Sequence, residues 1–392
     1  MKKIMKIVLA LLTFVIIIDP SNTIFHIKWL LGLFIAVVTL FGVVTKGKTH
    51  MTIPQIIWLF IAGIVALIPV CVTYNTSIAY DPEKLVGFTF SIFSFAFLLW
   101  IIIENEINLF FFLSVAGLGI AGITIVLFVS YWVAPDIYFG ISEYLIDKEA
   151  LMAGERESSL TAIQVYYKTS ATLIIPLAYH INSLLVKNNS YKRRVLFFTT
   201  STIFFWGMVF SGTRANVLLA VIVLCAIIFM KLCKSRIMQI SVVLIILSST
   251  LISMGWIFSN QDEYSNKIKL GHLVSYLELF EKSPEILLTG QGAGSQFYSQ
   301  SKGIVSLTEL TYFELIRVMG IPLFLIFLIF LLLPYYLTAV GNKTTINEKS
   351  ILVGYTGYLF IAATNPLILG STGIYAIVCT ISQVLANTKN WR

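Results

Sequence analysis

The chain is organised around the stretch Trp256–Gly320, which reads WIFSNQDEYSNKIKLGHLVSYLELFEKSPEILLTGQGAGSQFYSQSKGIVSLTELTYFELIRVMG. Apolar segments flank it on both sides, and almost all of the remaining chain is apolar enough for lipid. This stretch carries too many charged residues and glycines to lie in a hydrocarbon core. We therefore expect it to lie outside the membrane, between two spans.

The composition is typical of a membrane protein with many spans. The chain has 392 residues, of which 58% are hydrophobic and 12% charged, whereas soluble proteins carry roughly a quarter charged residues. Many apolar runs have the length of about 17–25 residues that a spanning helix needs. The alternation of a transmembrane barrel is absent, so we expect a single all-α membrane domain over residues 1–392.

Twelve spans fit the hydropathy pattern. We expect the N-terminal apolar run to be a first helix and not a cleaved signal, because no small-residue cleavage site follows it. The expected spans are 4–18, 24–45, 53–71, 84–103, 107–130, 169–186, 195–210, 215–232, 237–258, 312–337, 350–369 and 372–388.

The distribution of charge gives an orientation. With both termini in the cytoplasm, the short inner loops and termini hold 16 of the 27 basic residues and three of the 19 acidic ones. This excess of lysine and arginine follows the positive-inside rule. It also accounts for the net charge of +8 as orientation and attraction to anionic lipid, so we expect no nucleic-acid partner.

Two large loops then lie on the outer side, at residues 131–168 and 259–311. The spacing of Val274, Leu277, Leu279, Phe280 and Leu287 predicts an amphipathic helix at the membrane interface in the second loop. We find no internal repeat between the two halves, which argues against a transporter built from repeated bundles.

Arg214 is the first candidate for a functional site. It lies in the tight outer turn Ser-Gly-Thr-Arg-Ala-Asn at 211–216, between two apolar segments. An arginine near the hydrocarbon core usually marks a function, and its planar guanidinium suits a phosphate. Snorkelling to the headgroups and a structural ion pair are the alternatives.

The second outer loop supplies further candidates. Lys267, Lys269 and His272 place positive charge near the surface, and His272 and Tyr276 would share a helix face. The run of Gly290, Gly292 and Gly294 could expose backbone N–H groups to an anion, although a plain turn explains it equally well.

Acidic and polar residues also lie near the outer ends of the tenth and eleventh expected spans. Glu309 precedes the tenth span, where a partly desolvated carboxylate would serve as a base. Glu314 and Arg317 are three residues apart, the spacing of an intrahelical ion pair. Asn365 precedes a proline that should interrupt the eleventh span. No Asp-x-Asp pair, HExxH motif or phosphate loop occurs, so we expect no metal site and no cofactor.

Four motifs, in order, resemble the bacterial O-antigen polymerases of the Wzy type, which are relatives of the O-antigen ligases. They are the turn at 211–216, the segment KIKLGHLVSY at 267–276 followed by Pro284 and the glycine run, the segment TELTYFELIRVMG at 308–320, and TNPLILGSTG at 364–373. The likeness covers roughly residues 205–375. Two positions depart from the ligases. Glu309-Leu310-Thr311-Tyr312 stands where they carry His-Asn-x-Tyr, and His272-x-x-x-Tyr276 stands where they carry Arg-x-x-x-Trp, so the basic role falls to Lys269 or is lost.

The resemblance implies a multi-pass enzyme of the bacterial inner membrane with a GT-C-like, integral-membrane glycosyltransferase architecture and periplasmic outer loops. Its substrates would be oligosaccharide repeat units on undecaprenyl diphosphate, and a chain-length regulator would be a partner. In this scheme Arg214 and Arg317 hold the donor diphosphate, and Glu309 deprotonates the acceptor. The other candidates bind substrate: Lys267, Lys269, His272, Tyr276, Gly290, Gly292, Gly294, Tyr312, Glu314 and Asn365. A lipid-linked oligosaccharide flippase and an O-antigen ligase are the alternatives.

Overall fold

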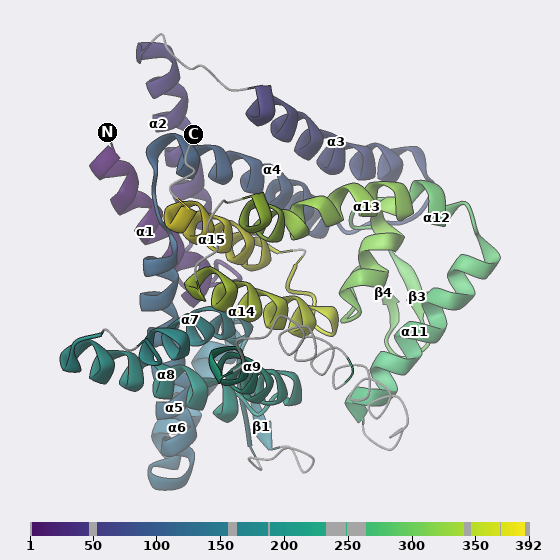
Figure 1. Ribbon diagram of the computed structural model, residues 1–392. Coiled ribbons are helices and arrows are strands. Elements are labelled where there is room, and N and C mark those ends of the chain that lie inside the picture. The colour runs from purple at the N-terminus through teal and green to yellow at the C-terminus, as the bar shows by residue number, and fades with distance from the viewer. Residues whose placement is uncertain are drawn as a thin grey trace.

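The computed structural model describes residues 2–46, 53–155, 163–186, 189–232, 248, 264–340, 346–368 and 370–388. Helices dominate these residues (Figure 1). In chain order the elements are α1 (Lys2–Ile18), α2 (Lys28–Lys46), α3 (Ile53–Asn75), α4 (Pro82–Asn105), α5 (Phe110–Val133), α6 (Pro135–Asp147), β1 (Leu151–Glu155), β2 (Ile163–Tyr167), η1 (Ser170–Leu173), α7 (Ile174–Leu184), α8 (Tyr191–Phe210), α9 (Arg214–Leu232), α11 (Tyr264–Lys282), α12 (Ile286–Thr289), β3 (Phe297–Ser299), β4 (Gly303–Val305), α13 (Thr311–Val340), α14 (Ile346–Ala363) and α15 (Ser371–Thr388).

Four of the described helices are long and apolar enough to cross a membrane, which indicates a membrane protein. They coincide with the expected spans at 84–103, 107–130, 215–232 and 312–337, and they are Pro82–Asn105, Phe110–Val133, Arg214–Leu232 and Thr311–Ala339. Shorter apolar helices occupy parts of other expected spans. The expected span at 237–258 lies outside the described residues. The count of twelve and the orientation therefore stay predictions.

The expected span at 169–186 differs from the structure. A 3-10 helix over Ser170–Leu173 leads into the 11-residue helix α7, which covers only about 16 Å at 1.5 Å per residue. Instead of spanning alone, α7 lies buried between α8, α9 and α14. Gly354 of α14 permits the close contact, because a Cβ atom there would lie 2.7 Å from the Cβ of Ala178.

Two antiparallel hairpins add strands to the expected all-α fold. In the first of the two large loops, at residues 131–168, β1 pairs with β2, and Leu151 lies opposite Tyr167. In the second, β3 pairs with β4, and Phe297 lies opposite Val305. Strands of three to five residues are too short to produce a clear alternation in a sequence this apolar.

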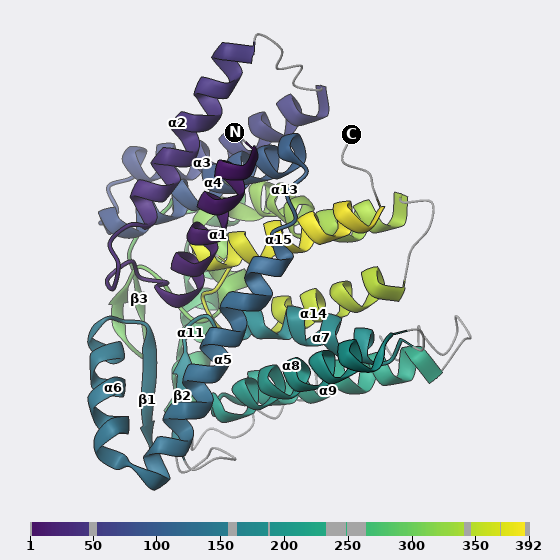
Figure 2. The same cartoon turned by 90° about the vertical axis from the view of Figure 1, so that its left-hand side faces the viewer.

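The loop elements gather at one end of the bundle. Figure 2 shows α6, β1, β2, β3 and α11 toward the left, while α8, α9 and α14 extend to the right. Two hydrogen bonds join helix ends to neighbouring segments there. Thr169 Oγ1, just before η1, donates to the carbonyl of Ile17 in α1 at 2.6 Å. Thr311 Oγ1, at the start of α13, donates to the carbonyl of Asn365 after α14 at 2.6 Å.

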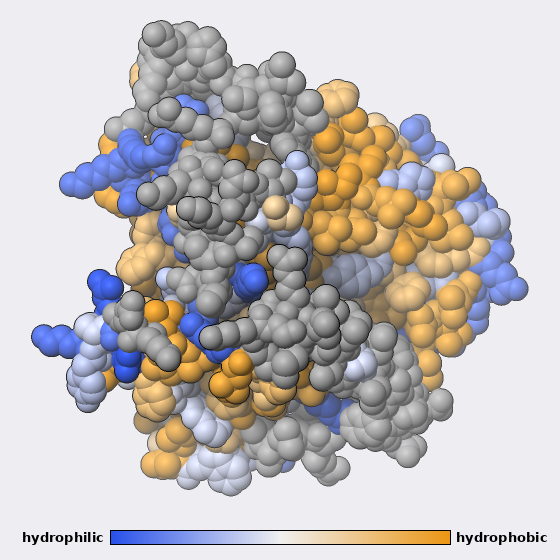
Figure 3. Space-filling model, in the orientation of Figure 1, coloured by the Kyte–Doolittle hydropathy of each residue, from blue (hydrophilic) through white to orange (hydrophobic). Residues whose placement is uncertain are grey.

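One side of α13 remains exposed and apolar. Its exposed large residues recur at helical spacing, as Ile321, Leu325, Ile329, Leu332 and Tyr336. The space-filling view shows hydrophobic residues gathered over the region of α3 and α13 (Figure 3). An uncovered surface of this kind is compatible with contact to lipid.

Candidate functional site

The site begins at a kink in α13. Gly320 has φ 70° and ψ 167°, which is outside the helical region, and Pro322 follows it. A proline has no N–H, so the carbonyl of Val318 loses its intrahelical partner. The carbonyl of Arg317 faces the residue after the kink and also leaves the helical ladder. Two carbonyl groups are thus free to accept bonds from elsewhere.

The segment that contains the glycine run supplies donors to these two carbonyl groups. The N–H of Gln291 donates to the carbonyl of Arg317 at 2.6 Å, and the N–H of Gly292 donates to the carbonyl of Val318 at 3.0 Å. The next N–H, of Ala293, donates to the carbonyl of Pro69 in α3 at 3.1 Å. The segment is therefore held between α13 and α3.

The three expected substrate-binding glycines have a packing role in this arrangement. Gly290, Gly292 and Gly294 all have positive φ. A Cβ atom on Gly292 would collide with Thr73, and one on Gly294 would lie 2.6 Å from the carbonyl oxygen of Asp81. The N–H groups of residues 290–293 donate to protein carbonyls, so the expected anion nest is not formed by these groups.

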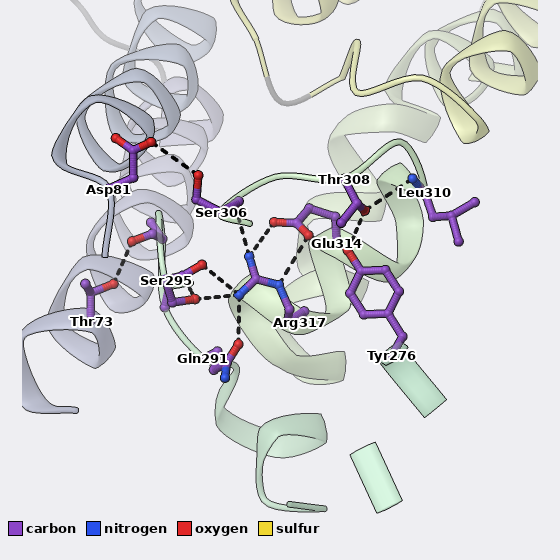
Figure 4. Close-up of polar contacts among 12 residues, drawn as sticks. Thr73, Asp81, Tyr276, Gln291, Ser295, Ser306, Thr308, Leu310, Glu314 and Arg317 are labelled. Atoms are coloured by element: carbon purple, nitrogen blue, oxygen red, sulfur yellow. Dashed lines mark hydrogen bonds and ion pairs between the residues drawn. The ribbon is translucent and has the colours of Figure 1, made fainter. Parts of the chain in front are cut away.

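Arg317 lies beside this segment and is completely buried. Its Nη2 and Nε donate to the two carboxylate oxygens of Glu314, at 2.6 and 3.2 Å. Its Nη1 donates to Gln291 Oε1 and Ser295 Oγ, both at 2.7 Å (Figure 4). Its Nη2 also donates to the carbonyl of Ser306 at 3.2 Å.

Each N–H of the Arg317 guanidinium can thus be assigned to a protein acceptor, and the group also lies 4.6 Å from the ring centroid of Phe297. The sequence predicted that Arg317 would hold a diphosphate. In this arrangement it has no N–H to spare for one, and it instead fixes the loop between α12 and α13.

Tyr276 brings α11 into the same network. Its hydroxyl donates to Glu314 Oε2 and lies 2.6 Å from Thr308 Oγ1. Its ring stacks on Phe297 and Phe313, with centroids 5.1 and 5.8 Å apart. Burial, and then the carboxylate of Glu314, raise the pKa of Tyr276, so the phenol stays protonated as a donor.

The apolar side of α11 is therefore used within the protein. Leu273, Leu279 and Phe280 pack around Tyr276, and Leu277 is the one large apolar residue among those described on α11 that is well exposed. The structure has a helix, α11, over most of this pattern, while Leu287 lies in α12. Contact of α11 with a membrane interface stays a prediction.

His272 lies one helical turn before Tyr276 on α11, as the spacing predicted. It is completely buried, whereas the sequence suggested a positive charge near the surface. Its Nδ1 lies 2.8 Å from Ser299 Oγ. Its Nε2 has no partner among the described residues. Burial, followed by the nearby Lys302, lowers the pKa of His272. Of the two candidate lysines on this helix, Lys267 is exposed and Lys269 is half-buried.

Glu309 lies at the edge of the network and is partly accessible. Its side chain is 31% exposed, and Lys302 Nζ lies 3.4 Å from its Oε1. Burial, and then the carboxylate of Glu309, raise the pKa of Tyr166 in β2. Glu309 is thus a carboxylate that a ligand could reach.

The turn that contains Arg214 meets the same strand. Gly212 has φ 67°, and a Cβ atom there would lie 2.9 Å from the Cα of Gln164. Arg214 begins α9 and is half-buried. Gln164 and Tyr166 are two positions apart, about 7 Å along one face of the strand. Strand β2 therefore packs against the turn that contains Arg214.

The last two candidates lie where α13 meets α14. Tyr312 Oη donates to the carbonyl of Leu359 at 3.0 Å. Helix α14 ends at Ala363, before Asn365 and its proline, as the sequence predicted. Asn365 Nδ2 donates to the carbonyl of Ile361 at 3.0 Å, so this amide caps the end of the helix.

Several residues of the network carried no sequence signal that singled them out. Gln291, Ser295 and Phe297 have common polar or aromatic side chains, and only folding brings them to Arg317. The kink could have been found, because Gly320-Ile321-Pro322 interrupts an apolar run. Tyr166 was hidden in a loop without a clear strand pattern.

Among the described residues, no three side chains of histidine, cysteine, aspartate or glutamate lie close enough together to hold a metal ion. Comparison with protein-family models finds no match for this chain, and a search of curated proteins finds no match either.

Proposed function

We propose that the chain is a membrane glycosyltransferase of the O-antigen polymerase type. It would transfer a growing polysaccharide from undecaprenyl diphosphate onto a new lipid-linked repeat unit, at the periplasmic face of the inner membrane. The observations that carry the proposal are the packing of the Arg214 turn against Gln164 of β2 and the partly exposed carboxylate of Glu309 beside Lys302. These are the cation and the carboxylate that the chemistry requires.

The reaction needs two kinds of group. The acceptor hydroxyl attacks the anomeric carbon of the donor sugar, a new C–O bond forms, and the bond to the diphosphate oxygen breaks. Glu309 takes the proton of the acceptor hydroxyl. Arg214 neutralises the charge that develops on the leaving diphosphate. Undecaprenyl diphosphate then departs.

The buried residues have a supporting part in this proposal. Arg317, Glu314 and Tyr276 hold α11 and the loop before α13 in one arrangement. Because Glu309 lies in that loop, the network fixes the direction from which its carboxylate meets the acceptor. These three are positioning residues, and their loss should act through the fold of the loop.

The test is a surface-polysaccharide gel from the host strain with the gene deleted, then complemented. Polymerase activity predicts that the deletion leaves lipid core with one repeat unit, and that the wild-type gene restores a ladder. Arg214→Ala, expressed at the wild-type level, should not restore it.

Other outcomes would identify another function. Bare core with long polymer left on the lipid carrier would mean a ligase, and bare core with single units trapped inside would mean a flippase. Either result would contradict the proposal. A full ladder from Arg214→Ala would remove the diphosphate role of that residue alone.

A further inference from the structure

The turn between β3 and β4 carries a lysine that reaches the carboxylate of Glu309. Lys302 Nζ lies 3.4 Å from Glu309 Oε1, and both side chains are partly exposed. An ion pair as accessible as this contributes little to the stability of a fold. A reason for it must therefore be sought in what it does to Glu309.

The turn itself is held against α11, which lies beside β3 and β4 in Figure 1. Three successive residues of the turn contact this helix, so the main chain that leads into Lys302 has a fixed position. Ser299 Oγ lies 2.8 Å from His272 Nδ1, the N–H of Gln300 donates to Ser275 Oγ at 2.9 Å, and Ser301 Oγ donates to the carbonyl of Ile268 at 3.1 Å.

A glycine of α11 permits this close docking. A Cβ atom on Gly271 would lie 2.7 Å from the Cβ of Ser301 and 3.2 Å from its amide nitrogen. Two carbon atoms that are not bonded prefer a separation of about 3.5–4.0 Å. A side chain at position 271 would therefore push the turn away from the helix, and Lys302 would move with it.

The loop that carries Glu309 is fixed as well. Thr308 Oγ1 lies 2.6 Å from Tyr276 Oη in α11. The carbonyl of Ser306 accepts from Arg317 Nη2 in α13 at 3.2 Å. Both ends of the ion pair thus lie on main chain that other hydrogen bonds hold in place. What the ion pair adds is a restraint on the rotation of the Glu309 carboxylate.

We propose that Lys302, placed by the docking of its turn on α11, is a positioning residue for Glu309: it holds Oε1 so that Oε2 takes the proton of the acceptor hydroxyl. This inference rests on the proposed polymerase function and adds a residue that orients the base. The proton passes to Oε2 as the hydroxyl oxygen bonds to the anomeric carbon and the diphosphate leaves. A base held in one direction needs less reorientation before transfer.

The first experiment compares Lys302→Met with Lys168→Met in purified protein. The acceptor is the repeat unit on a short-chain prenyl diphosphate, and its concentration is varied at saturating long-chain donor. We expect Lys302→Met to lower kcat about tenfold or more and to leave the acceptor KM unchanged. Lys302→Arg keeps a cation beside Glu309 and should retain most of the wild-type kcat. Lys168→Met removes another partly exposed ion pair, with Glu149, and should keep the wild-type kcat.

The second experiment uses Gly271→Ala to move the turn while Lys302 stays in the chain. Alanine favours a helix more than glycine does, so α11 should remain folded. We expect a lower kcat at an unchanged acceptor KM. In the Lys302→Met background, Gly271→Ala should have no further effect on kcat, because the group that it displaces is absent.

A wild-type kcat for Lys302→Met would overturn the inference, and so would an equal loss in Lys168→Met. A raised acceptor KM at the wild-type kcat would also contradict it, since Lys302 would then bind substrate. Additive losses from Gly271→Ala and Lys302→Met would show that the docked turn does not act through the lysine. These failures differ from failure of the proposed function, in which the wild-type protein itself would form no polymer.

Discussion

Gly290 and Gly320 lie backbone to backbone. A Cβ atom on Gly320 would lie 2.9 Å from the amide nitrogen of Gly290, and one on Gly290 would lie 2.8 Å from the amide nitrogen of Gly320. Both residues have φ near +70°, where a side chain is strained. The contact joins the kink of α13 to the loop that carries the Arg317 network.

Gly320→Ala should destabilise the protein for this reason. The new methyl group would lie 2.5 Å from the carbonyl oxygen of Leu288, in a left-handed conformation. We expect the free energy of unfolding to fall by about 2–4 kcal/mol, measured as a lower Tm in detergent. The control is Gly119→Ala in α5, which has open space around it and should leave the Tm unchanged or raise it. Equal Tm values for the two variants would contradict the packing role.

Arg317→Ala should also destabilise, because it leaves Glu314 charged and unpaired in a buried position. We expect a loss of about 3–5 kcal/mol in the free energy of unfolding. Lys282→Ala removes an exposed ion pair with Glu278 and should cost less than about 1 kcal/mol. In a double-mutant cycle, Arg317→Met and Glu314→Leu together should cost less than the sum of the two single changes. Additive effects would show that the pair does not act as a unit.

The stability of the protein should fall in mild acid because of His272. Its pKa is lowered from 6.5 in the folded state, so below about pH 6.5 the unfolded chain binds a proton that the folded protein excludes. The free energy of unfolding therefore decreases as the pH drops toward the pKa of His272 in the folded protein. Above about pH 6.5 the imidazole is neutral in both states, and His272 no longer makes the stability depend on pH. We expect His272→Gln to have a flatter dependence of Tm on pH between 7.5 and 5 than the wild type. Parallel curves would contradict this assignment.

Glu309→Gln tests the proposed base. We expect the transfer rate to fall by about 10²-fold or more. The free energy of unfolding should stay within about 1 kcal/mol of the wild-type value, because the ion pair with Lys302 is partly exposed. Glu278→Gln, which also lies in the large loop at residues 259–311, is the matched control and should remain fully active. Full activity of Glu309→Gln would mean that another group takes the proton.

The sequence predicted the long apolar helices well, since α4, α5, α9 and α13 depend on local hydropathy and length. The four-residue spacing also predicted that His272 and Tyr276 share a face of α11, but not that this face is buried. The expected span at 169–186 is helical over residues 170–184, but it begins as a 3-10 helix, a local change that hydropathy does not predict.

The site was harder to predict because its partners are distant in the sequence. The spacing of Glu314 and Arg317 predicted their ion pair, but the burial of Arg317 depends on Gln291 and Ser295, more than 20 residues away. The glycine run suggested anion binding, whereas its N–H groups meet carbonyls released by the kink at Gly320. Such matching of one loop to one broken helix has no local signature.

The most direct test of the central claim is transfer by the purified protein in liposomes supplied only with the lipid-linked repeat unit. The account predicts that the wild-type protein forms polymer and releases undecaprenyl diphosphate. It also predicts that Arg214→Ala and Glu309→Gln, each folded to the wild-type Tm, are slower by about 10²-fold or more. Folded wild-type protein that forms no polymer, or variants that form it at the wild-type rate, would contradict the account.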